Sequence, residues 1–186
     1  MEPHGSAGFV RDATAGDAAE IAAIQSTCWS HDYSWPDEFH AALRESDPEM
    51  QWARAVIAPP GPGYRVIVAT HASQVVGFAA LAPSQDADAQ AGEVEIVAWE
   101  VTPDHRGHGH GSRLLAALAD HARSVGAHSL TIWIPPTDEA RRFVLHDAGF
   151  AADGAHRTIQ VDAGQVDAGL GDAELSLRQV RLHSAL

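Results

Sequence analysis

The sequence predicts an α/β or α+β fold, in which a mixed, mostly antiparallel sheet of about seven strands is flanked by about four helices. Short segments rich in Val, Ile and Trp, typical of strands, are interspersed with segments whose apolar residues repeat at helical spacing. Their order is strand, helix, helix, three strands, helix, strand, helix and two strands. At 186 residues the chain suits one domain, which we expect to span 1–186 with its core at about 9–181.

The N-terminal part of the chain holds one strand and two helices. A short apolar strand at 9–10 leads through a polar turn into a helix whose buried stripe is Ile21, Ile24 and Cys28. A lone cysteine in such a stripe is expected in the core and not as a nucleophile. The residues between this helix and the next strand read as irregular, apart from a short helix expected at 36–44 and a Pro- and Gly-rich loop.

The rest of the chain predicts alternating strands and helices. Strands at 65–70 and 75–81, joined by a short polar turn, predict an antiparallel hairpin. A polar loop at 83–92 precedes a long strand at 94–101. The remaining elements are a helix at 113–125 with Leu114, Leu115, Leu118 and Ala122 on its buried face, a strand at 130–134, a helix at 137–148 that ends at Gly149, and strands at 158–161 and 175–180.

The composition excludes several classes of function. The formal charge is −13 and all 12 basic residues are Arg, so a nucleic-acid-binding face is not expected. Without lysine the chain cannot form a Schiff base, and its single cysteine permits neither an internal disulfide nor a multi-cysteine zinc site. No apolar run approaches the roughly 18 residues of a membrane span, and residues 1–12 do not resemble a secretory signal. We therefore expect a cytoplasmic protein with no nucleic-acid or membrane partner.

The most informative segment is the glycine-rich loop at 101–112, Val-Thr-Pro-Asp-His-Arg-Gly-His-Gly-His-Gly-Ser, between a strand and a helix. The first N–H groups of a helix have no partner within it, and the helix dipole adds partial positive charge there. Glycines let a phosphate approach these groups closely, so the loop predicts a phosphate or pyrophosphate site. Its histidines, His105, His108 and His110, have no carboxylate or cysteine at ligand spacing, so no metal is expected.

Two common phosphate-binding motifs do not fit this loop. The dinucleotide fingerprint requires a third glycine where Ser112 stands, and the nucleotide P-loop requires a lysine. The pattern that fits is Arg-x-x-Gly-x-Gly, formed by Arg106, Gly109 and Gly111 directly after Val-x-Pro. It resembles the acetyl-CoA pyrophosphate loop of the GNAT superfamily of acyl-CoA-dependent N-acyltransferases.

The resemblance extends beyond the loop. Residues 10–17 are similar to the first strand and turn of these enzymes, residues 76–79 and 95–101 to their third and fourth strands, and residues 148–150 to their helix-closing Gly-Phe motif. It implies a GNAT-type fold that binds acetyl-CoA as co-substrate and transfers the acetyl group directly to a primary amine. The residues that it implies for coenzyme binding are Trp99, Val101, Thr102, Arg106, Gly107, His108, Gly109, His110, Gly111 and Ser112.

Transfer to an amine requires a base, because an alkyl ammonium with a pKa of about 10.4 is neutral only about once in 2,500 at pH 7. Glu95 is the leading candidate, since Glu95-Ile96-Val97 falls where Glu-Ile-Val begins the same strand, with the catalytic Glu, in histone acetyltransferases of the superfamily. Its apolar neighbours should raise its pKa. Strand alternation puts Glu95 on the face of Trp99 and the alternative base, Glu100, on the opposite face. Glu95 could instead be a solvated charge or a binding residue.

The proton donor that the family uses is missing from this sequence. The Tyr of the last helix falls on Leu145, or on Val144 if one extra residue is allowed, and neither can donate a proton. The leaving thiolate, with an intrinsic pKa of about 8.5, could be protonated by water, or His146 or Tyr33 could substitute. A backbone N–H at a strand bulge would suffice to polarise the thioester carbonyl.

The acceptor is less well defined than the coenzyme. The acidic balance of the chain favours a small cationic amine, with a protein or peptide amine as the alternative. A non-catalytic acyl-CoA-binding module is the alternative from another class, and a homodimer is a further candidate because relatives are often dimers. The family builds its acceptor site from the region that here holds Trp29, Asp32, Tyr33, Trp35, Asp37 and Glu38.

Overall fold

The computed structural model describes residues 8–33, 46–161 and 175–186, and its centre is a seven-stranded sheet with the order β1-β2-β3-β4-β5-β7-β6. Neighbouring strands are antiparallel except β4 and β5, which are parallel. This confirms the predicted mixed, mostly antiparallel sheet. The strands are β1 (Phe9–Asp12), β2 (Arg65–His71), β3 (Gln74–Pro83), β4 (Glu93–Val101), β5 (Ser129–Ile134), β6 (Ala151–Val161) and β7 (Leu175–Ala185).

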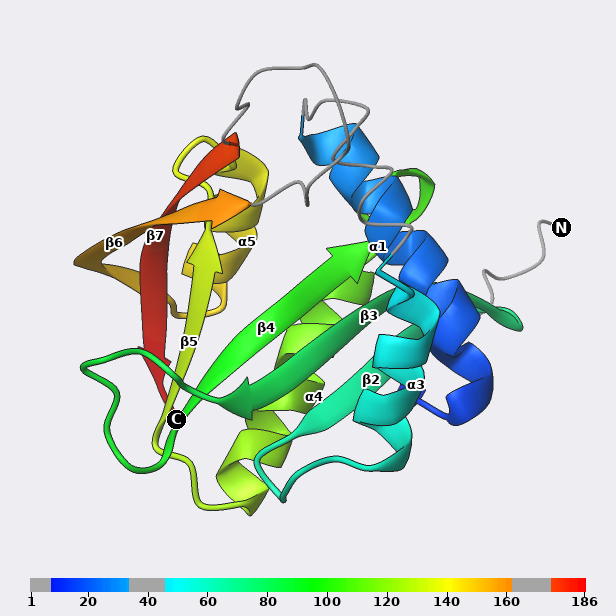
Figure 1. Cartoon of the computed structure of the whole chain (residues 1–186), viewed down its shortest axis with the longest axis horizontal. Helices are drawn as coiled ribbons and strands as arrows, with labels where there is room; N and C mark the ends of the chain where they lie inside the picture. Colours follow the sequence, from blue (N-terminus) through cyan, green and yellow to red (C-terminus); the bar gives the residue numbers. More distant parts are fainter. Residues whose placement is uncertain (1–7, 34–45, 162–174) are drawn as a thin grey trace, which may run out of the picture.

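Helices cover both faces of the sheet (Figure 1). Helices α1 (Ala18–Asp32) and α3 (Pro48–Ile57) lie over β2–β4 on the face turned to the viewer, which we call the front face. Helices α4 (His110–Ser124) and α5 (Glu139–Asp147) lie behind the sheet. Two single 3₁₀ turns, η1 (Ala15–Asp17) and η2 (Pro103–His105), precede α1 and α4. Within the described ranges, no helix is both long and apolar enough to cross a membrane.

Helix α3 lies in the stretch that the sequence predicted to be irregular. Asp47 caps it, because its side chain accepts a hydrogen bond from the backbone N–H of Met50, and Pro48 occupies the first turn. This Asp-Pro pair is the signal that would have predicted the helix. Trp52 fixes α3 to the sheet through an edge-on contact with the ring of Phe78, 5.0 Å between centroids. The helix expected at 36–44 lies outside the described residues.

Apolar side chains form one core cluster on each side of the sheet. The front cluster contains Ile21, Ile24 and Cys28 of α1, as predicted, packed against Phe78. The rear cluster is larger and joins α4 and α5 to the sheet. It confirms the predicted buried face of α4, which is Leu114, Leu115, Leu118 and Ala122.

A β-bulge in β4 corrects the predicted alternation of its side chains. Ala80 of β3 pairs with Ala98 and Leu81 pairs with Ile96, so Val97 is the extra residue. The extra residue reverses the alternation after that point. Trp99 packs in the rear cluster together with Ile96. Glu95 and Glu100 consequently share the front face, although the sequence predicted that they lie on opposite faces.

Strands β4 and β5 start side by side and then separate. Their pairing covers only residues 93–96 and 129–132, and Figure 1 shows the two strands diverging toward their C-terminal ends. From Val97 onward, the edge of β4 that faces β5 has no strand partner within the described chain. The carbonyl of Val101 accepts a hydrogen bond from Arg106, and the other backbone groups on this edge are available to a ligand between the strands.

Three boundaries differ from the sequence-based prediction by three residues or more. Helix α4 begins at His110, three residues before the predicted 113, because the glycine loop itself turns into the helix. Strands β6 and β7 are longer than the predicted 158–161 and 175–180. An irregular register between Ala152 and His156, where Gly154 has φ +89°, interrupts the alternation of β6 and conceals its first half in the sequence.

Asp17 anchors the start of α1, and its loss should weaken the fold. It accepts two hydrogen bonds of 2.7 Å from Arg11 and one each from the N–H and hydroxyl of Thr14, and these groups hold its pKa well below the usual value. Asp17→Asn should lower the free energy of unfolding by about 2 kcal/mol at pH 7 in urea titrations.

The pH dependence of this effect follows from the sign of the pKa shift. A carboxyl whose pKa is lowered by folding stabilises the protein above its unfolded pKa and loses that contribution as the pH falls. The difference between Asp17→Asn and the unaltered protein should therefore shrink below about pH 4. Asp12→Asn is the control, because Asp12 forms an exposed ion pair with Arg65 worth at most about 1 kcal/mol. Equal effects of the two substitutions would contradict the assignment.

Candidate active site

A cavity of about 790 Å³ opens where β4 and β5 separate, a size typical of small-molecule sites. Its walls come from the end of α1, from β4, from the glycine loop and from the start of α5. The cavity therefore reaches from the front face to the rear face of the sheet. All sequence-predicted coenzyme residues line it except Thr102 and His108: Trp99, Val101, Arg106, Gly107, Gly109, His110, Gly111 and Ser112.

The glycine loop has the geometry of an anion cradle. Gly107 and Gly109 both have φ +77°, a conformation that other residues rarely adopt. Gly111 lies so close to Trp99 that a Cβ there would be 3.1 Å from its ring. Within the described chain, the N–H groups of residues 109–112 donate no hydrogen bond of ordinary geometry, because the first bond of α4 is donated by Arg113. A pyrophosphate fits these free donors at a helix start.

Arg106 connects the loop to α1. Its Nε donates to the carbonyl of Val101 at 2.9 Å, and its two Nη atoms donate to Asp32 at 2.7 and 2.9 Å. Burial disfavours the charged form of Asp32, but hydrogen bonds from Arg106 and His31 outweigh it, so the pKa of Asp32 is lowered. The Arg106 guanidinium thus faces a carboxylate, whereas the backbone N–H groups at the start of α4 face no acceptor within the described chain.

Glu100, the alternative base, is held in an ion pair. It is 4% exposed and accepts a hydrogen bond from Arg141 of α5, which also contacts Asp32 and Asp138 at 3.3 and 3.2 Å. Burial raises the pKa of Glu100, and Arg141 opposes the increase. Sequence reasoning missed Arg141, whose partners come from α1 and β4, and only the Asp138-x-x-Arg141 spacing of a helix cap could have singled it out.

Glu95 lies on the front face just before the bulge and does not line the cavity. Its side chain is 12% exposed and forms a loose ion pair with Arg157 of β6, with 3.8 Å between Oε1 and Nη2. Burial raises the pKa of Glu95, Arg157 opposes this and Asp86 adds to it, with a net increase. The expectation of a raised pKa is confirmed. Within the described chain the Glu95 carboxylate makes no hydrogen bond.

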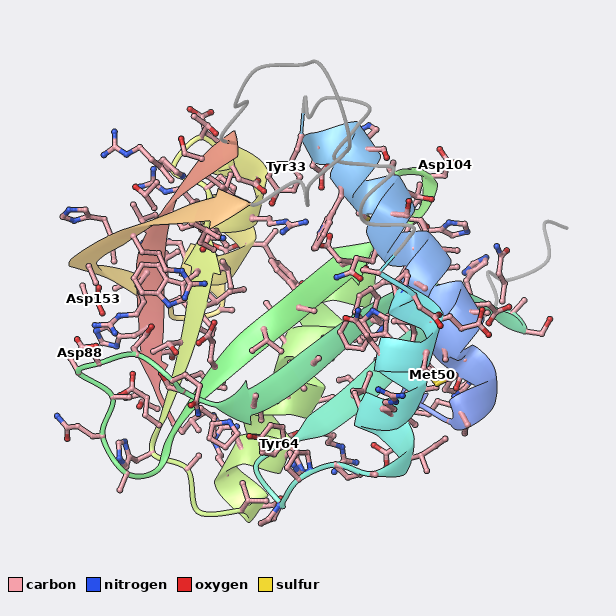
Figure 2. The ribbon with its side chains drawn as sticks, viewed as in Figure 1. Tyr33, Met50, Tyr64, Asp88, Asp104 and Asp153 are labelled. Atoms are coloured by element: carbon pink, nitrogen blue, oxygen red, sulfur yellow. The ribbon has the colours of Figure 1, made fainter. Side chains whose placement is uncertain are left out.

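The candidate proton donors occupy different positions. Leu145 is fully buried in the rear cluster, whereas Val144 lines the cavity, so of the two positions considered for the family's Tyr only Val144 borders the cavity. His146 is exposed on α5 and does not line the cavity. Tyr33, labelled in Figure 2, lies at the end of α1 and lines the cavity. Burial raises its pKa to about 12.

The residues expected to build the acceptor site also differ in whether they line the cavity. Asp32 lines the cavity beside Tyr33, and Trp29 packs against the front cluster. Trp35, Asp37 and Glu38 lie outside the described residues. Cys28 is fully buried 3.4 Å from the carbonyl of Val101, and burial raises its pKa to about 12, which confirms a core role. In the part of the chain that the structure describes, no group of three or more His, Cys, Asp or Glu side chains could hold a metal ion.

The fold and this site combine a glycine-rich helix start with a cavity between two diverging strands. Comparison with known families identifies the class of protein, because the model of the acetyltransferase (GNAT) family matches residues 19–150. The chain therefore belongs to the GNAT family and is an acyltransferase of the N-acetyltransferase type.

Two curated relatives and one solved structure illustrate the similarity. The L-amino acid N-acyltransferase MnaT of Escherichia coli is 29% identical over 76% of this chain and 78% of its own. The L-methionine sulfoximine/L-methionine sulfone acetyltransferase of Salmonella typhimurium is 28% identical over 84% of this chain and 87% of its own. A putative acetyltransferase from Salmonella typhimurium, solved with its cofactor acetyl-CoA, is 25% identical, with a TM-score of 0.66 over 97% of this chain and 94% of its own.

Proposed function

We propose that this protein transfers the acetyl group of acetyl-CoA directly to the primary amine of a small molecule, with Glu95 as the general base. The observation that carries the proposal is the cavity, which joins the free N–H groups at the start of α4 to the opening between β4 and β5. The pyrophosphate would bind the N–H groups of residues 109–112, and the unpaired edge of β4 beyond Val97 would bind the chain that carries the acetyl group.

The reaction requires three proton and charge movements. Glu95 takes a proton from the ammonium of the acceptor, and the neutral nitrogen forms a bond to the acetyl carbon. A backbone N–H on the unpaired edge of β4 stabilises the charge on the carbonyl oxygen. The carbon–sulfur bond then breaks, and the thiolate takes up one proton from water or from Tyr33, which lines the cavity. The nitrogen loses a second proton as the amide forms, and this proton replaces the one that water or Tyr33 gave to the thiolate. Glu95 releases its own proton to solvent, so the ammonium and acetyl-CoA yield the amide, the coenzyme A thiol and one H⁺.

Two observations support a small acceptor over a protein amine. The two curated relatives are named for amino acids and amino-acid analogues, which are small molecules. The carboxylate of Glu95, the proposed base, and that of Asp86 nearby also favour the approach of an ammonium group. The proposal includes a single domain over residues 1–186 and a cytoplasmic location.

Free-thiol release from acetyl-CoA across a panel of amines tests the proposal. The panel contains L-amino acids, polyamines, aminoglycosides and Lys-containing peptides, and we expect release with one class of small amine. Release with peptides alone would overturn the small-molecule acceptor. Acetyl-CoA binding measured by calorimetry, without release on any amine, would overturn catalysis and leave a binding module.

A further inference from the structure

Two arginines lie on the part of the front face that no described helix covers. Figure 1 shows α1 and α3 over β2–β4, while β5, β6 and β7 carry no helix in front of them. There, Arg157 of β6 and Arg181 of β7 both approach the ring of Trp133 of β5, with guanidinium carbons 4.3 and 5.6 Å from its centroid. Their environments differ, and the difference assigns them different roles.

Arg181 is saturated by acidic partners and has a structural role. Its guanidinium binds Asp86, Asp88 and Asp153 at distances of 3.0, 2.6 and 2.7 Å. Asp88 and Asp153, labelled in Figure 2, lie close together at the edge of the molecule. Arg181 thereby ties the loop between β3 and β4 to the β6–β7 hairpin, and it has no terminal nitrogen to spare for a ligand.

Arg157 has terminal donors to spare. Its Nε donates to Oε1 of Gln179 at 2.8 Å, and its planar group stacks on Trp133, so the orientation of the guanidinium is fixed. Its Nη1 and Nη2 lie 3.8 Å from Asp86 and Glu95, which is an attractive separation but too long for a hydrogen bond. The side chain is 36% exposed. A fixed, accessible guanidinium with two free nitrogens matches the geometry of a carboxylate.

We propose that Arg157 binds the α-carboxylate of an α-amino-acid acceptor and places its α-amine at Glu95. By covalent geometry the amine nitrogen and the nearer carboxylate oxygen of an α-amino acid are about 3 Å apart. This separation lets the two groups bridge Glu95 and Arg157, whose own atoms are 3.8 Å apart. Each end of the acceptor then meets its opposite charge, while an amine without a carboxylate leaves Arg157 unpaired beside it. The inference rests on the proposed function, because the amine at Glu95 is the one that is acetylated.

The test compares two acceptors in the unaltered protein and in three variants. The best L-amino acid of the panel is paired with the amine that lacks only its α-carboxylate, and the ratio of their kcat/KM values is measured. We expect the unaltered protein to prefer the amino acid and Arg157→Met to reduce the ratio roughly 10- to 100-fold, with partial rescue in Arg157→Lys. Arg178→Met is the control, because Arg178 is exposed on the opposite face of β7 and its loss changes the net charge equally. Its ratio should not change.

The ratio separates carboxylate binding from an indirect effect on the base. Arg157 lies next to Glu95, so its removal also changes the pKa of the base, but that change affects both acceptors alike. An equal loss of kcat/KM for both acceptors in Arg157→Met would overturn the proposal.

A binding measurement tests the carboxylate site at Arg157 even if no acceptor is acetylated. Absence of thiol release would contradict the proposed function, whereas calorimetric titration of the amino-acid panel in the presence of coenzyme A would still test Arg157. Binding that Arg157→Met weakens tenfold or more, and that Arg178→Met leaves intact, supports the carboxylate site. Binding of no amino acid, or equal affinity in both variants, would overturn it.

Discussion

Replacing Glu95 by Gln should lower kcat by roughly 100-fold or more, because the amide cannot accept the proton of the ammonium group. The change is nearly isosteric at a side chain that is only 12% exposed, so the fold should persist. Steady-state kinetics with the acceptor identified by thiol release measures the effect. Glu93→Gln is the matched control, since Glu93 lies on the same strand and binds the backbone N–H of Gln90 in the adjacent loop.

The pH–rate profile provides the sharper test of the same substitution. Burial raises the pKa of Glu95, so the carboxylate form, and with it the rate, should increase as the pH rises through that raised value. In Glu95→Gln this step should disappear, and the rate should instead continue to increase until the pH reaches the pKa of the acceptor's own amine. A variant that keeps both the rate and the profile of the unaltered protein would exclude Glu95 as the base.

Gly109→Val should weaken acetyl-CoA binding by roughly 100-fold or more, since loss of two hydrogen bonds to a charged group costs about 3–6 kcal/mol. Gly109 adopts φ +77° at the start of α4, where a β-branched residue is strained. Relief of that strain turns the N–H groups of the cradle away from the phosphate, and the added side chain occupies the approach. Calorimetric titration with acetyl-CoA measures the loss.

Gly126→Val separates backbone strain from loss of the cradle. Gly126 has φ +80° at the other end of α4, and a Cβ there would meet nothing within 4 Å. Both variants should lose similar stability, about 1–2 kcal/mol, and only Gly109→Val should lose the coenzyme. Undiminished affinity in Gly109→Val, or an equal loss in Gly126→Val, would refute the cradle assignment.

The sequence alone determined the features that depend on neighbouring residues. The glycine loop could be recognised because a helix start and the glycines around it are contiguous, and their N–H groups need no partner from elsewhere. The buried stripe of α4, the core position of Cys28 and the order of the elements followed from local periodicity and were confirmed, apart from the second helix, expected at 36–44 outside the described residues. Helix α3 was missed although its cap, Asp47 with Pro48, is equally local.

Only the tertiary structure decided where the charged side chains point and what they meet. The bulge at Val97 arises where β4 must pair with β3 while it departs from β5, and it moved Glu95 to the face of Glu100. Arg157 reaches Glu95 from a strand 62 positions later in the chain, through the register of β6 on β7 and of β7 on β5. Strand register and bulges depend on contacts between distant segments, so periodicity within one segment does not contain them.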